Sequence, residues 1–377
     1  MDFELSEEQQ AIAELAGQIL ADKLPPERLR EVEADQPDRW LVDDVWHELA
    51  KADLLGICLP EAVGGGGYGF LEACLLLEAV GRAAAPLPVL PTLVLGALPI
   101  AAFGSAALQQ ALLPGVVDGS TILTAALQED GDYSSPTVPA TAARADGDAW
   151  VLDGEKTYVP AAHLAARILV PARTGDAATT VFLVDPSAEG VTLESSAAIT
   201  GEPLATVRLS GVRVGRDDVL GEVDGGAAIA RWIADRAIAA LCSTQVGVCD
   251  GALRITAAYV SEREQFGSKI GTFQAVAQRI ANAYIDTEAI RLTALQAAWR
   301  LSAGLEADDE LHIAKYWAAD GGHRVVHAAQ HLHGGIGLDI DYPVHRYFRW
   351  TKAMELTLGH ATTHLRGLGQ RIAAAPA

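Results

Sequence analysis

Basic residues are scarce in this sequence: 28 lysines and arginines stand against 49 aspartates and glutamates, and the formal net charge is -21. A field of that sign repels nucleic acids and anionic membrane surfaces, because both are themselves negatively charged. The composition therefore argues against both as partners, and any anionic ligand must be held by local cations. Hydrophobic residues make up 50% of the chain, which is typical of a globular protein with a large core and not of a disordered one.

Cysteine is also rare, and the four present show no C-x-x-C spacing of the kind that binds metals. They lie in apolar surroundings, which predicts buried, reduced thiols. Long uninterrupted apolar runs are missing as well, because the longest, 83–102, contains four prolines that would break a helix. The acidic start lacks the basic region of a signal peptide. These absences together predict a cytoplasmic protein without a membrane-spanning helix.

The spacing of apolar residues changes twice along the chain and predicts three domains. Residues 1–118 favour helices, beginning with Ser6 and Gln9, which are spaced as a capping box. Residues 119–222 favour short strands joined by Gly-containing turns, as in a small antiparallel β domain. Residues 223–377 return to helical spacing in long segments that would pack as a four-helix bundle. The predicted fold class is therefore mainly α with a central β domain, with strands at 122–126, 149–152, 166–170, 181–184 and 207–209.

Two motifs in the last domain combine a cation, glycine turns and amides. The first is R-E-Q-F-G at 263–267, which is followed by Phe273 and Gln274. The second is H-G-G-I-G at 333–337. Such groups suit the pyrophosphate and adenine of a bound dinucleotide, because glycines admit close approach of the backbone and cations neutralise phosphate. The motifs predict a site for an anionic cofactor.

These motifs, in their order, resemble those of the acyl-CoA dehydrogenase family over essentially the whole chain. The family also has a P-E-x-x-G-G turn, matched here at 60–65, and a segment before its catalytic loop that is matched by D-Y-P-V at 341–344. The resemblance implies a helical domain, a β domain and a helical bundle, with FAD as cofactor. It also implies α,β-desaturation of an acyl-CoA thioester, in which a carboxylate removes the α-proton and the flavin takes the β-hydrogen as hydride.

A leucine occupies the place of the family's catalytic carboxylate. The usual base is the Glu of an E-G-T turn, and the matching residues read L-G-H at 358–360. A hydrocarbon side chain cannot accept a proton. Two acids remain as alternative bases, Glu355 and Asp235. Glu355 lies three residues before Leu358, and in a helix this separation corresponds to a rise of roughly 4.5 Å. Some relatives carry their catalytic Glu on the first bundle helix, directly before an Arg, and Asp235 stands directly before Arg236 in the same way. Counting back without gaps from Phe266, however, the position of that Glu corresponds to Ala237.

The flavin contacts of the β domain also differ from those of the family. The family's W-I-T is replaced by Tyr158-Val159-Pro160, and proline lacks both the hydroxyl and a backbone donor. The preceding loop, residues 128–135, carries additional negative charge, which would oppose flavin and CoA phosphates. We therefore expect both the catalytic base and the flavin contacts of the β domain to be weakened in this chain.

The residues by which family members reach the cofactor of a neighbouring subunit are retained. By resemblance, Arg263 and Phe266 would contact the FAD of the neighbour, and Gln274 would contact its adenosine region. The Gly334-Gly335 turn would let the backbone approach the pyrophosphate. His331 stands where the family often has Gln, so the resemblance implies a cofactor contact there too.

This combination resembles one branch of the family, the heteromeric α2β2 enzymes of bacterial steroid side-chain breakdown, in which one subunit type lacks the catalytic Glu. It predicts a catalytic acyl-CoA dehydrogenase subunit as partner and a bulky, polycyclic acyl-CoA bound mainly by that partner. Two other interpretations stay open: a homotetrameric enzyme that uses Glu355 or Asp235, and a flavin-free acyl-CoA-binding scaffold. No metal site is expected at His323, His327 and His331, although they are spaced four residues apart, because no acid or thiol is fixed nearby.

Overall fold

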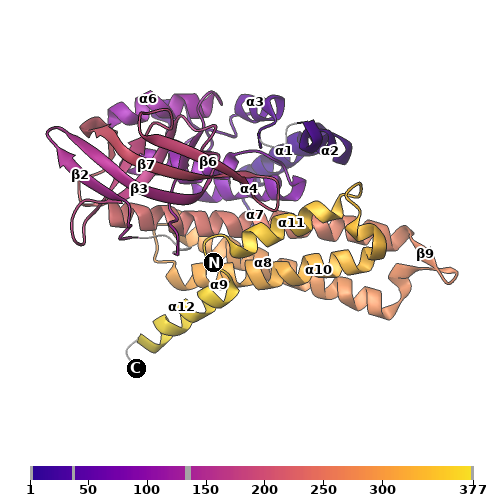
Figure 1. Ribbon diagram of the computed structural model, residues 1–377. Coiled ribbons are helices and arrows are strands. Elements are labelled where there is room, and N and C mark those ends of the chain that lie inside the picture. The colour runs from indigo at the N-terminus through magenta and orange to yellow at the C-terminus, as the bar shows by residue number, and fades with distance from the viewer. Residues whose placement is uncertain (1–2, 36–38, 132–136, 375–377) are drawn as a thin grey trace. The chain divides into compact units, whose positions relative to one another are not determined.

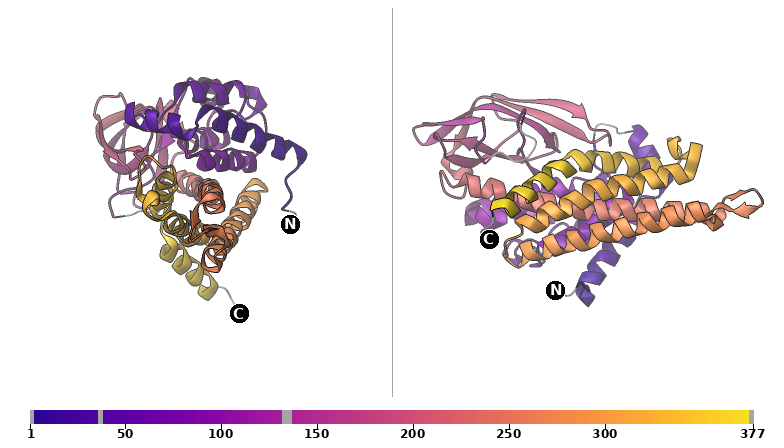
Figure 2. Two further views of the ribbon diagram at one scale, coloured as in Figure 1. Left: turned by 90° about the vertical axis from the view of Figure 1, so that its right-hand side faces the viewer. Right: turned by 90° about the horizontal axis from the view of Figure 1, so that it is seen from below.

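The computed structural model describes residues 3–35, 39–131 and 137–374. These residues fall into two compact units (Figures 1 and 2), here called the helical unit and the sheet unit. The helical unit consists of Met1–Asp35, Cys74–Ala85 and Ile238–Ala377, and the sheet unit consists of Gln36–Ala73 and Pro86–Ala237. The mainly helical fold class with a central sheet is confirmed, whereas the domain boundaries at 118 and 222 stay a prediction.

The sheet unit contains an eight-stranded sheet with strand order β6-β7-β3-β2-β4-β5-β8, in which β1 pairs with β4. The strands are β1 (Leu123–Ala125), β2 (Ala142–Asp146), β3 (Ala149–Pro160), β4 (Arg167–Arg173), β5 (Thr179–Val184), β6 (Val191–Ala197), β7 (Pro203–Gly215) and β8 (Val219–Leu220). All five predicted strands are present. Neighbouring strands are antiparallel except that β1 and β2 lie parallel to β4.

Alternation of side chains along the strands builds the core of the sheet unit. In β7, Ala205, Val207 and Leu209 are buried at every second position and pack with Phe182 of β5. β5 is buried along its whole length, as expected of a strand covered on both faces. The helical elements of this unit are α3 (Asp43–Lys51), the 3-10 turns η1 (Glu61–Val63) and η3 (Arg216–Asp218), the π-helix η2 (Leu90–Ala97), α5 (Leu98–Phe103) and α6 (Ala106–Val117).

The helical unit is built mainly from long helices lying side by side (Figures 1 and 2). Its first helix has the predicted capping box, in which Ser6 Oγ accepts from Gln9 N–H and Gln9 Oε1 accepts from Ser6 N–H. Its elements, with α4 and α7 assigned by the larger part of their length, are α1 (Glu7–Lys23), α2 (Pro26–Asp35), α4 (Phe70–Ala83), α7 (Gly226–Glu262), β9 (Glu264–Gln265), β10 (Ser268–Lys269), η4 (Ile270–Thr272), α8 (Gln274–Ser302), α9 (Asp308–Tyr316), η5 (Trp317–Gly321), α10 (Gly322–His333), η6 (Gly334–Leu338), α11 (Val344–Leu356) and α12 (Ala361–Ala374).

Helix α7 is long and apolar enough to cross a membrane by length and composition alone. However, 67% of its most apolar 18-residue window is buried within the protein. A mostly buried helix of this kind is typical of a protein core, so α7 is weak support for a membrane span.

The predicted state of the cysteines is confirmed, because Cys58, Cys74, Cys242 and Cys249 are all free and buried. Burial raises the pKa of Cys58, Cys242 and Cys249 to about 12. Thiols with such pKa values are not ionised at neutral pH and are therefore unreactive.

Candidate cofactor site

The two predicted cofactor motifs lie at the same end of the helical unit (Figures 1 and 2). Beyond the end of α7, the chain makes the β9–β10 hairpin, and α8 then begins at Gln274. Helix α10 ends at His333, and the 3-10 helix η6 that follows carries the glycine turn. The rings of Tyr259 and His333 stack with centroids 4.5 Å apart. This contact brings the end of α7 and the end of α10 together, although the motifs are far apart in sequence.

The tip of the hairpin presents an aromatic ring to its surroundings. Phe266 is 95% exposed, and both Phe266 and Gly267 have positive φ angles, 53° and 76°, as in the tight turns that close two-residue hairpins. Arg263 at the base is also exposed. Its N–H donates to Tyr259 O, and its carbonyl accepts from Ile270 N–H, both at 2.8 Å. The hairpin therefore has a closed base and an apolar tip suited to contact with another molecule.

Helix α8 begins without a side-chain cap, because its N-cap residue is Phe273. Gln274, its first residue, is exposed. The first N–H groups of a helix attract anions, and an arginine nearby adds a full positive charge. The start of α8 and the exposed Arg263 side chain therefore offer the groups that bind a phosphate.

The glycine turn offers room for close approach of a ligand. Gly334 and Gly335 are exposed, and a Cβ added at either would meet no atom within 4 Å among the described residues. Gly334 has φ 61° and ψ -135°, a conformation for which glycine is preferred. His331, on the last turn of α10, is also exposed. The six sequence-predicted residues thus share one end of one unit, and their chemistry fits the pyrophosphate of a dinucleotide such as FAD.

The turn that matches the family's base position connects α11 and α12. Leu358 is 8% exposed and has φ 54°, a left-handed backbone. His364 Nε2 donates to Leu358 O at 2.9 Å. Lys315 Nζ donates to Met354 O at 2.9 Å and to Gly359 O at 2.8 Å. The turn is therefore held through its carbonyls, and its side chain at 358 provides only hydrocarbon.

Two buried titratable groups beneath this turn differ in charge. Burial lowers the pKa of Lys315 to about 8, so the ammonium persists at neutral pH. Burial also lowers the pKa of His364 to about 4, which leaves its ring neutral. His364 Nδ1 lies 3.0 Å from His312 Nδ1, and because Nε2 is the donor to Leu358 O, Nδ1 must accept the hydrogen of His312.

The two alternative bases are engaged in ion pairs. Glu355 Oε2 accepts from Lys352 Nζ at 2.8 Å and lies 3.3 Å from His323 Nδ1. Burial raises the pKa of Glu355, but hydrogen bonds from Lys352 and His323 outweigh it and lower the pKa below its usual value. Asp235 lies 3.6 Å from Arg231 on α7. A stabilised carboxylate is a weaker base, so Glu355 is poorly suited to proton abstraction.

The loop before the family's flavin contact departs from its sequence-based expectation at Glu129. Its carboxylate was expected to oppose bound anions, but Glu129 is 6% exposed and accepts from Lys156 Nζ at 2.7 Å. Thr141 donates to it through N–H and Oγ1. Burial raises the pKa of Glu129, but Lys156 and these hydrogen bonds outweigh it and lower the pKa. The charge of Glu129 is therefore neutralised within the sheet unit; residues 132–135 of the loop lie outside the described residues.

Tyr158 and Pro160 lie near the end of β3. Tyr158 is half exposed and has φ 55°. Pro160 is paired with Leu204 of β7, and its ring carries neither a hydroxyl nor an N–H. The family's hydroxyl contact to flavin therefore has no counterpart at position 160.

Histidines on α10 form ring contacts. The rings of His323 and His327 have centroids 4.2 Å apart, and His327 packs edge-on against Phe348 at 4.9 Å. Across 3–35, 39–131 and 137–374, no group of three His, Cys, Asp or Glu residues could hold a metal ion.

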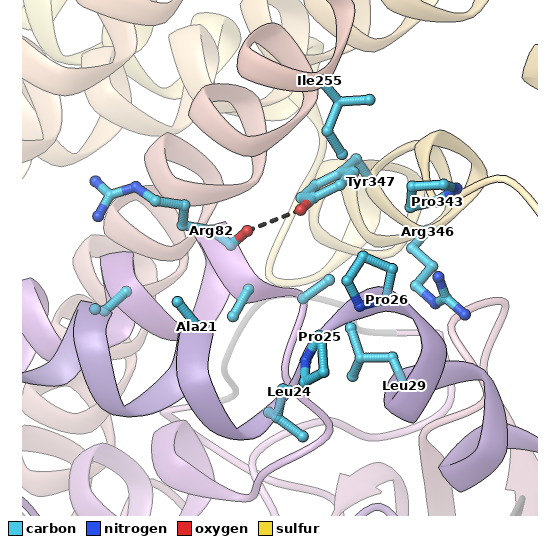
Figure 3. A pocket seen from close by; sticks show the side chains of 14 residues that line it. Ala21, Leu24, Pro25, Pro26, Leu29, Arg82, Ile255, Pro343, Arg346 and Tyr347 are labelled. Carbon is cyan, nitrogen blue, oxygen red and sulfur yellow. Dashed lines mark hydrogen bonds between the residues drawn. The ribbon is translucent and has the colours of Figure 1, made fainter. Parts of the chain in front are cut away.

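A cavity of about 300 Å³ opens elsewhere in the helical unit, among the α1–α2 turn, α4, α7 and the start of α11 (Figure 3). Its walls are mainly apolar. At its edge, Tyr347 OH donates to Arg82 O at 2.9 Å, and Arg346 donates two hydrogen bonds to Glu33, at 2.8 and 2.9 Å. No sequence motif predicted this cavity, because four distant segments form it.

Comparison with known proteins places these features in one family. Residues 6–120, 124–212 and 224–373 match the N-terminal, middle and C-terminal domains described for acyl-CoA dehydrogenases. Acyl-CoA dehydrogenase FadE27 of Mycobacterium tuberculosis is 38% identical over 100% of both chains.

Two solved structures are similar over nearly the whole chain. A variant of the Tcur3481-Tcur3483 steroid ACAD is 45% identical, with TM-score 0.89 over 97% of this chain and 98% of that one. The ChsE4-ChsE5 complex from Mycobacterium tuberculosis is 38% identical, with TM-score 0.93 over 100% of both chains. The chain therefore belongs to the acyl-CoA dehydrogenase family, a family of oxidoreductases whose cofactor is FAD.

Proposed function

We propose that this chain is the non-catalytic subunit of a heteromeric FAD-dependent acyl-CoA dehydrogenase. In this proposal it completes the flavin site of a partner subunit, and the partner supplies the base that removes the α-proton of the acyl-CoA. The observation that carries the proposal is Leu358, because the turn of the family's base is present and firmly held while its side chain cannot accept a proton. The ion pair of Glu355 supports it, since that carboxylate is occupied.

The role of the chain is to bind and position the cofactor. Arg263 and the uncapped start of α8 hold the pyrophosphate, and the Gly334-Gly335 turn admits it close to the backbone. Phe266 would contact the FAD, Gln274 would contact its adenosine region, and His331 would also contact the cofactor. FAD, when bound, supplies the acceptor for the hydride that leaves the β-carbon.

The partner in this proposal is a second acyl-CoA dehydrogenase chain that carries the Glu, in an α2β2 assembly. A heteromer is supported by the two similar structures, which are pairs of proteins, one of them a steroid ACAD. The almost fully exposed Phe266 at the hairpin tip supports contact with a second chain of either kind. The substrate class that follows is the CoA ester of a steroid side chain. A bulky ring system of this kind would be bound mainly by the partner, in the cytoplasm.

The test is to purify this chain alone, the partner alone and the co-expressed pair. Flavin absorbance is measured for each, together with the rate of dehydrogenation of a steroid side-chain CoA ester with an artificial electron acceptor. The pair should carry both flavin and activity, and this chain alone should show no turnover. Replacing the partner's catalytic Glu with Gln should abolish the rate. Glu355→Gln in this chain, the matched control, should leave the rate within about two-fold.

Three results would lead elsewhere. Turnover by a homo-oligomer of this chain would overturn the proposal, and its loss in Glu355→Gln or Asp235→Asn would then identify the base. Loss of the pair's activity in Glu355→Gln would likewise assign proton abstraction to this chain. A pair that binds acyl-CoA without any flavin would favour the scaffold interpretation.

A further inference from the structure

Three aromatic rings pack against one another where the segments of the candidate cofactor site begin or end, and are here called the aromatic cluster. They come from three segments of the helical unit: Tyr259 from α7, His333 from the end of α10, and Tyr342 from the loop before α11. The His333 ring stacks on Tyr259 with centroids 4.5 Å apart and is tilted by 53° against Tyr342 with centroids 5.1 Å apart. The two tyrosine rings lie 6.3 Å apart. Each segment is thus tied to the other two by a ring contact.

The nitrogen atoms of His333 form no hydrogen bond with the two tyrosines, so the ring itself makes those contacts. Its Nδ1 lies 2.8 Å from Ala329 O, one helical turn back, so Nδ1–H is the donor and Nε2 is left as an acceptor. Nε2 is buried and has no partner among the described residues. Burial lowers the pKa of His333, which favours the neutral ring. A buried acceptor left unsatisfied is unfavourable, so the ring contacts and the Nδ1–H bond to Ala329 O must together offset that cost.

Each residue of the aromatic cluster is joined to a segment of the cofactor site by a backbone hydrogen bond or by the chain itself. Tyr259 O accepts from the N–H of Arg263 at the base of the hairpin, at 2.8 Å. His333 directly precedes Gly334. Tyr342 N–H donates to Asp339 O at 3.1 Å, which closes the loop after the glycine turn. A displacement of any ring would therefore shift the hairpin relative to the turn.

We propose that the aromatic cluster of Tyr259, His333 and Tyr342 sets the spacing between the Arg263 hairpin and the Gly334-Gly335 turn, with His333 as a positioning residue for the cofactor. The inference rests on the proposed function, because it assumes that both segments hold one dinucleotide. A ligand that contacts two segments at once binds more tightly when their spacing is fixed beforehand, since no ordering cost falls on binding.

The test uses the complex of this chain with its catalytic partner. Flavin is removed, the complex is titrated with FAD, and affinity is followed by flavin fluorescence, with thermal unfolding measured in parallel. His333→Ala, which removes the ring with the two shortest contacts in the cluster, should weaken FAD binding by about ten-fold or more. His333→Phe keeps a ring of similar size without the nitrogens, and should restore the affinity to within about three-fold.

His327→Ala is the matched control. It is the same substitution on the same helix, and it also removes ring contacts, those with His323 and Phe348. It should lower the unfolding temperature while leaving FAD affinity unchanged. Should His333→Ala fail to assemble, Tyr342→Leu and Tyr342→Phe provide the same comparison at the half-buried residue of the aromatic cluster.

The outcomes separate the inference from the proposed function. Wild-type affinity in His333→Ala, an equal loss in His327→Ala, or no rescue by His333→Phe would each overturn the positioning role. In those cases the wild-type complex still binds FAD and the proposed function stands. A wild-type complex that takes up no FAD would instead overturn the proposed function.

Discussion

Acidification should destabilise the helical unit through His364. The residue is 4% exposed, its Nε2 donates to Leu358 O, and its Nδ1 accepts from His312 Nδ1. The contact with His312 requires a neutral ring, because a protonated ring would direct a second N–H at that of His312, whereas the Nε2–H bond to Leu358 O would persist. The ammonium of Lys315 further disfavours the charged ring. Protonation of His364 therefore opposes the folded state.

The size of the effect follows from its pKa. Burial is the main cause that lowers the pKa of His364 from the usual 6.5 to about 4. The unfolded chain, in which the ring keeps its usual pKa, binds the proton more readily, so protonation favours unfolding. The stabilisation is fully present above pH 6.5 and is lost as the pH falls toward 4. At about 1.4 kcal/mol for each unit by which the two pKa values differ, the loss is about 3 kcal/mol.

The assay is urea unfolding at a series of pH values, followed by the helical circular dichroism signal. Wild type is compared with His364→Gln, in which the amide can still donate to Leu358 O but cannot titrate. Between about pH 7 and 4, wild type should lose about 3 kcal/mol more stability than this variant. His47→Gln, at an exposed histidine of the sheet unit, should follow wild type. Parallel pH profiles for wild type and His364→Gln would refute the reasoning.

Three further outcomes are expected. Arg263→Ala should lower FAD affinity of the complex by about ten-fold or more, whereas Arg254→Ala, at an exposed arginine paired with Asp250 on α7, should not; equal effects in a fluorescence titration would contradict a specific phosphate contact. Lys156→Met leaves the buried carboxylate of Glu129 without its cation and should destabilise the sheet unit by about 3–5 kcal/mol in denaturant unfolding; an unchanged midpoint would count against this pairing. A thiol reagent at neutral pH should label none of the four cysteines before unfolding, because they are buried; rapid labelling of the native chain would disprove their burial.

Local features of the fold were predictable from the sequence, and long-range ones were not. The capping box of Ser6 and Gln9 and the five strands depend on residues close together in the chain, so spacing alone revealed them. The neutralisation of Glu129 was missed because its cation, Lys156, lies on β3, 27 residues further along the chain. The hydrogen bonds from Lys315 to the turn at Leu358 were missed for the same reason. The helical spacing around a lysine does not indicate which distant carbonyls its ammonium will contact.

The hydrogen bonds from Lys315 and His364 also explain why the turn keeps its shape without a proton-accepting side chain at 358. Leu358 retains a left-handed backbone, which costs a non-glycine residue about 1 kcal/mol or more, so other bonds must maintain it. Lys315 and His364 supply them, and both bind main-chain carbonyls, those of Met354, Leu358 and Gly359. Every residue has a carbonyl, whatever its side chain. A hydrocarbon in place of a carboxylate at 358 therefore leaves intact the bonds that shape the turn, as the proposed function requires.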